Sequence, residues 1–245
     1  MSDFVAATDR ATPGLERGSV GAWVLRNARG ETGRANSATA HGDPGMAIDA
    51  AVDRVEAWFL ERDRVPTFQV YDETPAAVVA ELDTRGYVTG AITDVLSAPA
   101  EAVATPATAT SGWTVEVVAS MPPFLRRELA EARAVEMLCA DLPRWFVIAS
   151  QGGAVLASGM AIGDGDLVGV FAMRTHPDEQ GRGAGSAVLG ALVAEGRRRG
   201  ATTAWLQVEA SNRRAADWYA RLGFERRTGY RYRRLPDTAN SLNVR

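Results

Sequence analysis

The stretch from 175 to 189 reads THPDEQGRGAGSAVL and has glycines at three alternate positions, Gly181, Gly183 and Gly185. The run before it, LVGVFAMR, is apolar and β-prone, and the run after it has apolar residues at helical spacing. Glycine reaches backbone dihedrals that other residues avoid, so this turn can present consecutive N–H groups at the start of a helix. Those amides, the helix dipole and the charge of Arg182 would together favour a phosphate.

Two nucleotide-binding motifs differ from this turn. A P-loop needs Lys and then Ser or Thr after its last glycine, whereas Ser186 and Ala187 follow Gly185 here. A dinucleotide fingerprint would have its third glycine where Ser186 stands, in a βαβ unit early in the domain. From this segment alone, a second interpretation is also open: the glycines only let the chain change direction and bind nothing.

A second motif, QVEASNRRAADWYARLGF, follows at 207–224. The glycine turn resembles the pyrophosphate loop of the GNAT acetyltransferase superfamily, Q/RxxGxG/A, and the second motif resembles that family's signature NxxAxxxYxxxGF. The matching residues are Asn212, Ala215, Tyr219, Gly223 and Phe224. The resemblance covers 113–235 and is specific because both motifs occur in order, about one strand apart.

The resemblance implies that the turn holds the diphosphate of coenzyme A, with acetyl-CoA as cosubstrate and no metal. Residues Met173 to Thr175, on the edge of a splayed strand, would pair with the pantetheine amides, and a backbone N–H near Met173 would meet the tetrahedral oxyanion. The implied cofactor-binding residues are Met173, Arg174, Thr175, Gln180, Gly181, Arg182, Gly183, Ala184, Gly185, Ser186, Asn212, Ala215 and Tyr219.

The same resemblance makes Tyr219 the general acid that protonates the leaving thiolate. Tyr219 can also be interpreted as an aromatic residue packed beside Trp218, and Asn212 as a helix N-cap. The attacking ammonium must lose a proton, and Glu209 is the nearest carboxylate in the sequence, with Glu136 and Asp166 as other candidates. Each of these carboxylates can also be interpreted as an ordinary solvated side chain.

The second half alternates strand and helix patterns. We expect strands over 113–118, 145–150, 154–162, 167–174, 202–209 and 228–235, and helices over 122–138, 184–199 and 212–222. The segment 97–112, rich in Ala, Thr and Pro, has the composition of a linker, and the tail 236–245 has no apolar pattern.

The first half echoes the second, because the strand-helix segment 67–88 matches 204–225 with one insertion. Leu82 stands where Tyr219 stands in the second half, so the acid is missing. The glycine turn is replaced by HGDPGMA, in which Asp43 would repel a phosphate and Pro44 lacks an N–H. The polar segment 33–42 either lines an acceptor cleft or is a solvated loop.

The predicted fold is therefore α/β (α+β), with two tandem GNAT-like domains, each a mixed, mostly antiparallel sheet flanked by helices. The predicted boundaries are 1–96 for a degenerate N-terminal domain, 97–112 for a linker, 113–235 for the catalytic domain and 236–245 for a flexible tail. In tandem GNAT proteins one copy stays active and the other serves as scaffold or acceptor wall.

Composition excludes several classes of protein. One Cys and two His among 245 residues cannot form a disulfide framework or a conventional zinc cluster. No apolar run is long enough to span a bilayer and the N-terminus has no signal pattern, so we expect a cytoplasmic protein without a membrane partner.

Charge differs between the halves. Residues 1–112 hold 9 Arg and 16 acidic residues, whereas 113–245 hold 18 Arg and 14 acidic residues. A positive second half would suit a polyanionic ligand, although ordinary scatter also explains the difference. The run Arg197 to Arg199 fits the last turn of a helix better than a nucleic-acid patch.

The sequence thus predicts an acyl-CoA-dependent N-acyltransferase that moves an acetyl group from acetyl-CoA to a primary amine, with the C-terminal half catalytic. The alternative is a non-catalytic acyl-CoA-binding sensor or interaction protein. Small amines, peptides and proteins all remain open as acceptors, because fold does not decide function. This architecture also often forms homodimers.

Overall fold

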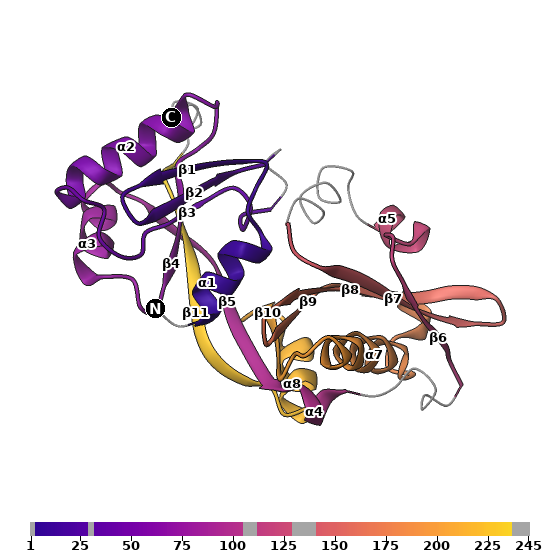
Figure 1. Ribbon diagram of the computed structural model, residues 1–245. Coiled ribbons are helices and arrows are strands. Elements are labelled where there is room, and N and C mark those ends of the chain that lie inside the picture. Colours follow the sequence, from indigo (N-terminus) through magenta and orange to yellow (C-terminus); the bar gives the residue numbers. More distant parts are fainter. Residues whose placement is uncertain (1–2, 29–31, 105–111, 129–140, 237–245) are drawn as a thin grey trace. The chain divides into compact units, whose positions relative to one another are not determined.

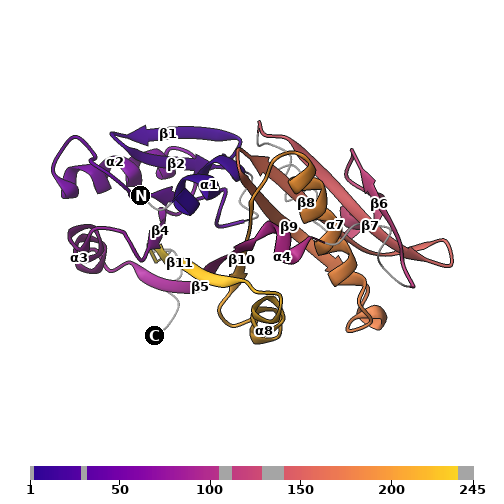
Figure 2. The same ribbon diagram turned by 60° about the horizontal axis from the view of Figure 1, so that its bottom comes forward.

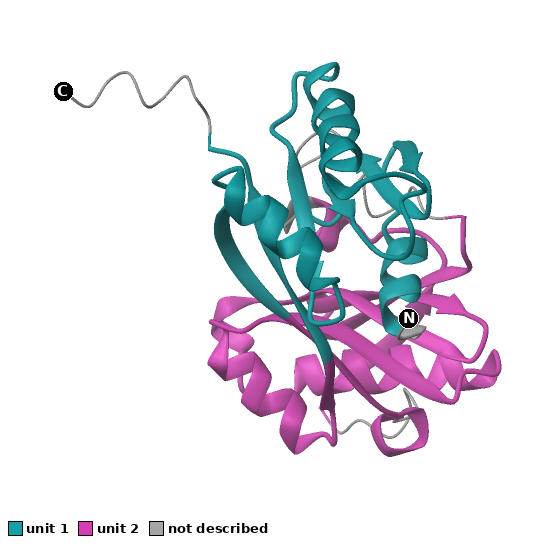
Figure 3. Cartoon of the chain, turned by 90° about the vertical axis from the view of Figure 1, so that its left-hand side faces the viewer, with its two compact units in different colours: residues 1–93, 135–140, 228–245 teal, residues 94–134, 141–227 magenta. Residues whose placement is uncertain are grey.

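The computed structural model describes residues 3–28, 32–104, 112–128 and 141–236. They form two compact units, coloured separately in Figure 3. Among the described residues, the first unit contains those up to Thr93 and those from Thr228 on, and the second contains Asp94 to Arg227.

Strands and helices of the first half follow one another along the chain (Figure 1). They are α1 (Asp3–Ala11), β1 (Glu16–Val20), β2 (Trp23–Asn27), β3 (Ala38–Thr39), α2 (Ile48–Leu60), β4 (Thr67–Tyr71), α3 (Ala76–Thr84) and β5 (Val88–Pro99). The strand-helix segment that the sequence predicts over 67–88 corresponds to β4 and α3.

The second half begins with the short helix α4 (Ala100–Val103). It continues with β6 (Thr114–Val118), α5 (Pro123–Glu128), β7 (Arg144–Gln151), β8 (Ala154–Asp164), β9 (Leu167–Thr175), η2 (Pro177–Glu179), α7 (Ala184–Arg198), β10 (Thr203–Glu209), α8 (Arg213–Arg221) and β11 (Glu225–Arg234). Each predicted strand and helix of this half is present, except that the helix predicted over 122–138 is described only as α5; its remainder lies outside the described residues.

The eleven strands within the described residues belong to one hydrogen-bonded sheet, in the order β1-β2-β3-β4-β11-β5-β10-β9-β8-β7-β6. The prediction of two separate sheets is therefore wrong. The strand predicted at 228–235 as the last of the second domain pairs instead with β4, with Tyr230 opposite Tyr71 and Arg234 opposite Thr67. In turn β5 from the first half lies beside β10. Strand pairing is decided by contacts between distant segments, which a local pattern does not contain.

The linker predicted over 97–112 also differs from the structure. Its first part continues β5 to Pro99 and then forms α4, and residues 105–111 lie outside the described part. Ala98, Ala100 and Val103 are buried in the core of the second unit. Alanines that resemble linker composition in sequence are here small enough to pack between larger side chains.

The core of the second unit lies between the sheet and α7, which packs against β7, β8 and β9 (Figure 2). Apolar residues recur along α7 at Val188, Leu189, Leu192 and Val193, and all four are buried. A Cβ on Gly159 of β8 would lie 2.9 Å from Leu192, so that glycine lets the helix approach the sheet closely. This packing fixes the N-terminus of α7 at the end of β9.

Candidate functional site

Strands β9 and β10 separate halfway along their length. They pair in parallel from Leu167 opposite Thr203 to Val170 opposite Leu206, and the last five residues of β9 have no partner in β10. On its other side β9 stays paired with β8. Phe171–Thr175 therefore have no strand partner on the β10 side, where an extended ligand could pair as an added strand would, although the Met173 carbonyl accepts a hydrogen bond of 2.9 Å from the Arg174 side chain.

A bulge marks the start of this free edge. The register of β8 and β9 shifts between Ser158 and Met160, and Ala172 has φ 50°, a rare value for a residue with a side chain. Bulges redirect backbone groups beside functional sites. Met173, predicted to supply an oxyanion N–H, lies within this bulge, between Phe171 opposite Met160 and Arg174 opposite Ser158.

The glycine turn connects this edge to α7. Gly181 and Gly183 have φ 82° and 90°, the left-handed conformations that the sequence predicts for them, and Gly183 is the N-cap of α7. The first amide bonded within the helix is that of Ala187, which donates to the carbonyl of Gly183 at 2.9 Å.

Five main-chain amides of the turn have no acceptor among the residues that the structure describes; they belong to Gly181, Gly183, Ala184, Gly185 and Ser186. Amides at the first turn of a helix lack intrahelical partners and carry the positive end of the helix dipole. A Cβ on Gly181 would meet nothing within 4 Å. The turn therefore has the open space and the donors that a diphosphate requires.

Side chains from other elements hold the turn in place. The indole of Trp113 donates to the carbonyl of Arg182 at 3.2 Å, and Arg214 of α8 donates to the side chain of Gln180 at 3.0 Å. Arg182 is exposed and forms an ion pair with Glu179 at 3.3 Å. Sequence reasoning missed Trp113 and Arg214, because nothing in the motifs links those positions to the turn.

Helix α8 approaches the same place. Its N-cap is Asn212, whose side-chain oxygen accepts from the amide of Ala215 at 3.2 Å, so the capping interpretation is confirmed. The amide group of Asn212 lies at an exposed position and can still contact a ligand. A Cβ on Gly185 would lie 3.8 Å from the ring of Trp218, which shows how closely α8 approaches α7.

Tyr219 is buried in the core of the second unit, with 8% of its surface exposed. Its ring packs on Trp218 at 4.7 Å and on Phe224 at 5.6 Å between centroids. Burial raises the pKa of Tyr219 to about 12, because the ionised form would lose its hydration. Its hydroxyl therefore carries its proton at neutral pH, as a general acid must.

The predicted bases differ in their positions. Glu209 lies at the end of β10 and is exposed. Asp166 precedes the other end of β9, seven residues and about 23 Å of strand from Met173, so it is not near the free edge. Glu136 lies outside the described residues. Glu209 is thus the candidate that the fold places at the splayed end of the sheet.

The run Arg197 to Arg199 serves the helix itself. Arg198 and Arg199 bind Glu195 at 2.7 and 2.8 Å, and the Arg199 guanidinium lies 4.7 Å from the centre of the Trp145 ring. Burial raises the pKa of Glu195, but hydrogen bonds from the two arginines outweigh it and lower that pKa below its ordinary value. Their role is the one predicted for cations in a last helical turn.

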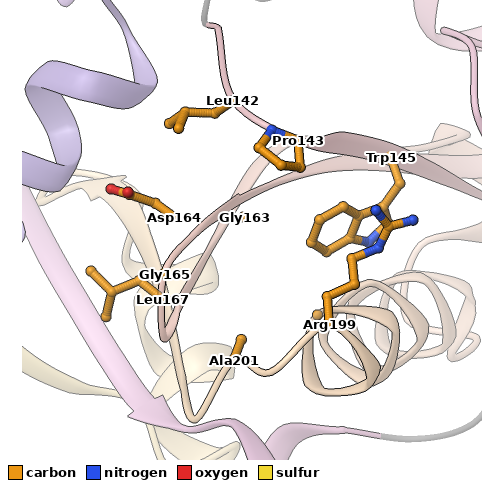
Figure 4. A pocket seen from close by; sticks show the side chains of 10 residues that line it. Leu142, Pro143, Trp145, Gly163, Asp164, Gly165, Leu167, Arg199 and Ala201 are labelled. Carbon is orange, nitrogen blue, oxygen red and sulfur yellow. The ribbon is translucent and has the colours of Figure 1, made fainter.

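A separate hollow lies at this end of α7 (Figure 4). It has a volume of about 370 Å³ and is lined by Leu142, Pro143, Trp145, Gly163, Asp164, Gly165, Leu167, Gly196, Arg199 and Ala201. Since α7 has 15 residues, this end is about 20 Å from the glycine turn. The hollow is therefore not part of the site at the splayed strands.

The C-terminal end of α8, the helix that follows β10, has a counterpart at the end of α3 in the first unit, but the site has none among the described residues. Phe224 donates to the carbonyl of Tyr219 at 3.1 Å, and Tyr87 donates in the same way to Leu82 at 3.0 Å. Gly86 and Gly223 are both left-handed. The segment 41–47 stands in place of the glycine turn. Within it, the carboxylate of Asp43 accepts a hydrogen bond of 2.8 Å from the amide of Gly45, so this amide is already bonded inside the turn.

A free strand edge beside a helix N-terminus rich in unbonded amides defines the class of the GNAT acetyltransferases. Known structures have the same fold. A GCN5-related N-acetyltransferase from Kribbella flavida has a TM-score of 0.74 at 18% identity over 98% of both chains. A tandem GNAT protein from the clavulanic acid biosynthesis pathway has a TM-score of 0.58 at 15% identity, over 78% of this chain and 69% of that one.

Residues 3–233 match the family described as "Probable histone acetyltransferase Rv0428c C-terminal", and the chain belongs to that family. It is an acetyltransferase. A segment of 63 residues is 41% identical to the [ribosomal protein bS18]-alanine N-acetyltransferase of Escherichia coli K12. This match covers 26% of the chain and 43% of that enzyme, so it spans less than half of the relative's length.

No helix within the described ranges has both the length and the apolar character needed to cross a membrane.

Proposed function

We propose that the protein transfers an acetyl group from acetyl-CoA to a primary amine and that the second unit carries the reaction. The observation that carries this proposal is the free edge of β9 beside five unbonded turn amides. Pantetheine amides would pair with Met173 to Thr175, and the diphosphate would accept from the turn between Gln180 and Ser186. Asn212 and Ala215 would contact the pantetheine arm at the start of α8.

The reaction joins the amine nitrogen to the thioester carbonyl carbon and then breaks the carbon–sulfur bond. In this proposal Tyr219, which is protonated at neutral pH, gives its proton to the departing sulfur. The N–H of Met173 stabilises the oxyanion before that bond breaks. Glu209, directly or through water, receives the proton that the attacking ammonium must lose.

The names of the relatives suggest where to look for the acceptor. One relative is named as an N-acetyltransferase for an alanine of a ribosomal protein, and the description of the matching family names a probable histone acetyltransferase. We infer that peptide and protein amines are the first acceptors to test, with small amines next. We also propose that the enzyme works in the cytoplasm, and light scattering on the purified protein tests whether it is a homodimer.

Titration calorimetry of acetyl-CoA into the protein tests the donor. We expect saturable binding that coenzyme A competes for, and no heat at millimolar acetyl-CoA would contradict the proposal. Thiol release across a panel of peptide N-termini, lysine peptides and small amines then tests the acceptor. Arg182→Gln should weaken acetyl-CoA binding, whereas the same change at the exposed Arg17 of β1 is the matched control.

A further inference from the structure

One face of the first unit's sheet carries buried polar side chains. Leu25, Ala38 and Phe68 belong to the apolar core that includes α2 and α3. Because successive side chains of a strand point to opposite faces, their neighbours Arg26, Thr39 and Gln69 point the other way. Burying polar side chains is costly unless they find partners.

Arg26 links these residues, although none of its surface is exposed. It forms an ion pair with Asp9 of α1 and donates to Thr39 at 2.5 Å and to Gln69 at 2.9 Å. Gln69 in turn donates to the hydroxyl of Tyr232 on β11 at 3.5 Å. The charge of Arg26 is therefore balanced by Asp9, and the chain of hydrogen bonds ends at Tyr232.

Three tyrosines continue this face. The ring of Tyr230 lies 5.0 Å from that of Tyr71 and 5.4 Å from that of Tyr232. Burial raises the pKa of Tyr71 and of Tyr232 well above the ordinary value of a tyrosine. Both phenols are thus neutral at physiological pH and supply no negative charge.

Arg34 is the second cation on this face. It lies in the segment 33–42, of which Ala35 and Ser37 to Ala40 are buried, so this segment is not a solvated loop. A Cβ on Gly33 would lie 2.5 Å from the Tyr232 ring, and this close approach brings the neighbouring Arg34 to the tyrosines. Arg34 hydrogen-bonds to Tyr230.

The charge of Arg34 has no counterpart among the described residues, which place no carboxylate within ion-pair distance of it. Arg34 and Tyr232 are both half-buried, whereas Tyr71 and Tyr230 are almost completely buried. The accessible part of this face therefore consists of a guanidinium that is permanently charged and a neutral phenol beside it.

We propose that Arg34 and Tyr232 bind the oxyanion of a small ligand, a carboxylate or a phosphate. A half-buried guanidinium gains a charge-assisted hydrogen bond from such a group, and its planar fork matches the two oxygens. The Tyr232 hydroxyl can donate a further bond. This site lies in the first unit and is independent of the proposed acetyl transfer.

Titration of the full chain with sodium phosphate or sodium acetate tests the site, at constant ionic strength and with coenzyme A added in excess. Binding is followed by NMR of the arginine Nε–H groups. The signal that is missing from the spectrum of Arg34→Lys is assigned to Arg34. We expect that signal to shift saturably. Arg34→Gln should weaken binding about 10-fold or more, as the loss of a hydrogen bond to a charged group does.

Arg17→Gln removes an equal charge from the exposed surface of β1 and should leave the affinity unchanged. Tyr232→Phe keeps the ring and should weaken binding several-fold. Tighter acetate binding would indicate a carboxylate ligand, and tighter phosphate binding a phosphorylated one. Equal affinities in Arg34→Gln and the unaltered protein, or an Arg34 signal that neither anion moves, would overturn the proposal. If Arg34→Gln does not fold, the shift in the unaltered protein and Arg34→Lys decide the question.

Discussion

The indole Nε1 of Trp113 donates a hydrogen bond of 3.2 Å to the carbonyl oxygen of Arg182. Trp113 directly precedes β6, the edge strand of the second unit, whereas Arg182 lies in the middle of the glycine turn. The bond orients the turn's peptide groups, and the indole lies 3.9 Å from the position of a Cβ on Gly183. The edge of the sheet thus helps to set the direction of the amides that would bind a diphosphate.

Trp113→Phe removes this bond and keeps an aromatic ring. We expect the KM for acetyl-CoA to rise about 3- to 10-fold, as the loss of one neutral hydrogen bond predicts, with kcat unchanged. Steady-state kinetics with varied acetyl-CoA measures both constants. An unchanged KM would show that the turn keeps its geometry without the indole.

Gly183→Ala places a side chain at φ 90° in the N-cap of α7. Left-handed backbone costs about 1–2 kcal/mol for such a residue, so the free energy of unfolding should fall by about that amount. Acetyl-CoA binding should weaken as the turn relaxes. The control is Gly165→Ala, also left-handed at φ 61° with open space around it, in the β8–β9 turn. It should lose similar stability and keep its affinity for acetyl-CoA; equal losses of affinity would contradict a role for the turn.

Tyr219→Phe tests the general acid. We expect kcat to fall about 100-fold, within the range of acid catalysis, while the dissociation constant for acetyl-CoA stays the same. Trp218→Phe is the neighbouring aromatic control and should spare kcat. A Tyr219→Phe enzyme that turns over normally would remove the hydroxyl from the mechanism.

The pH dependence of stability gives an independent check on Tyr219. Its pKa is raised from 10.0 to about 12 in the folded protein, so the unfolded chain releases this proton first as pH rises. The stability that Tyr219 contributes is complete below pH 10 and is lost between about pH 10 and 12. Urea unfolding from pH 9 to 11.5 should show a shallower decline in Tyr219→Phe, and parallel curves would contradict the raised pKa.

Glu195→Gln tests the arginine pair at the end of α7. Because the pKa of Glu195 is lowered in the fold, its contribution is present above the ordinary value of 4.5 and lost as pH falls through the folded pKa. We expect Glu195→Gln to cost about 1 kcal/mol at pH 7, a modest figure because solvent screens the two arginines. The difference should shrink in urea unfolding as pH falls below 4.5, and a difference that stays constant with falling pH would exclude this electrostatic origin.

Local chemistry determined most of the second half of this protein. Apolar, β-prone runs predicted β7, β8 and β9, and the glycines of the turn predicted unusual backbone conformations, which Gly181 and Gly183 adopt. The spacing of the two motifs identified the acetyltransferase superfamily. These features depend on residues close in the sequence, and so they can be read from it.

Only the tertiary structure decided the rest. Strand β11 pairs with β4, more than 150 residues earlier in the chain, and β5 lies beside β10. The contact of Trp113 with Arg182, the burial of Tyr219 and the gathering of Arg34 with Tyr230 and Tyr232 likewise join distant segments. The free energy of such pairings comes from cross-strand packing and from the exclusion of water, and both depend on which segments meet.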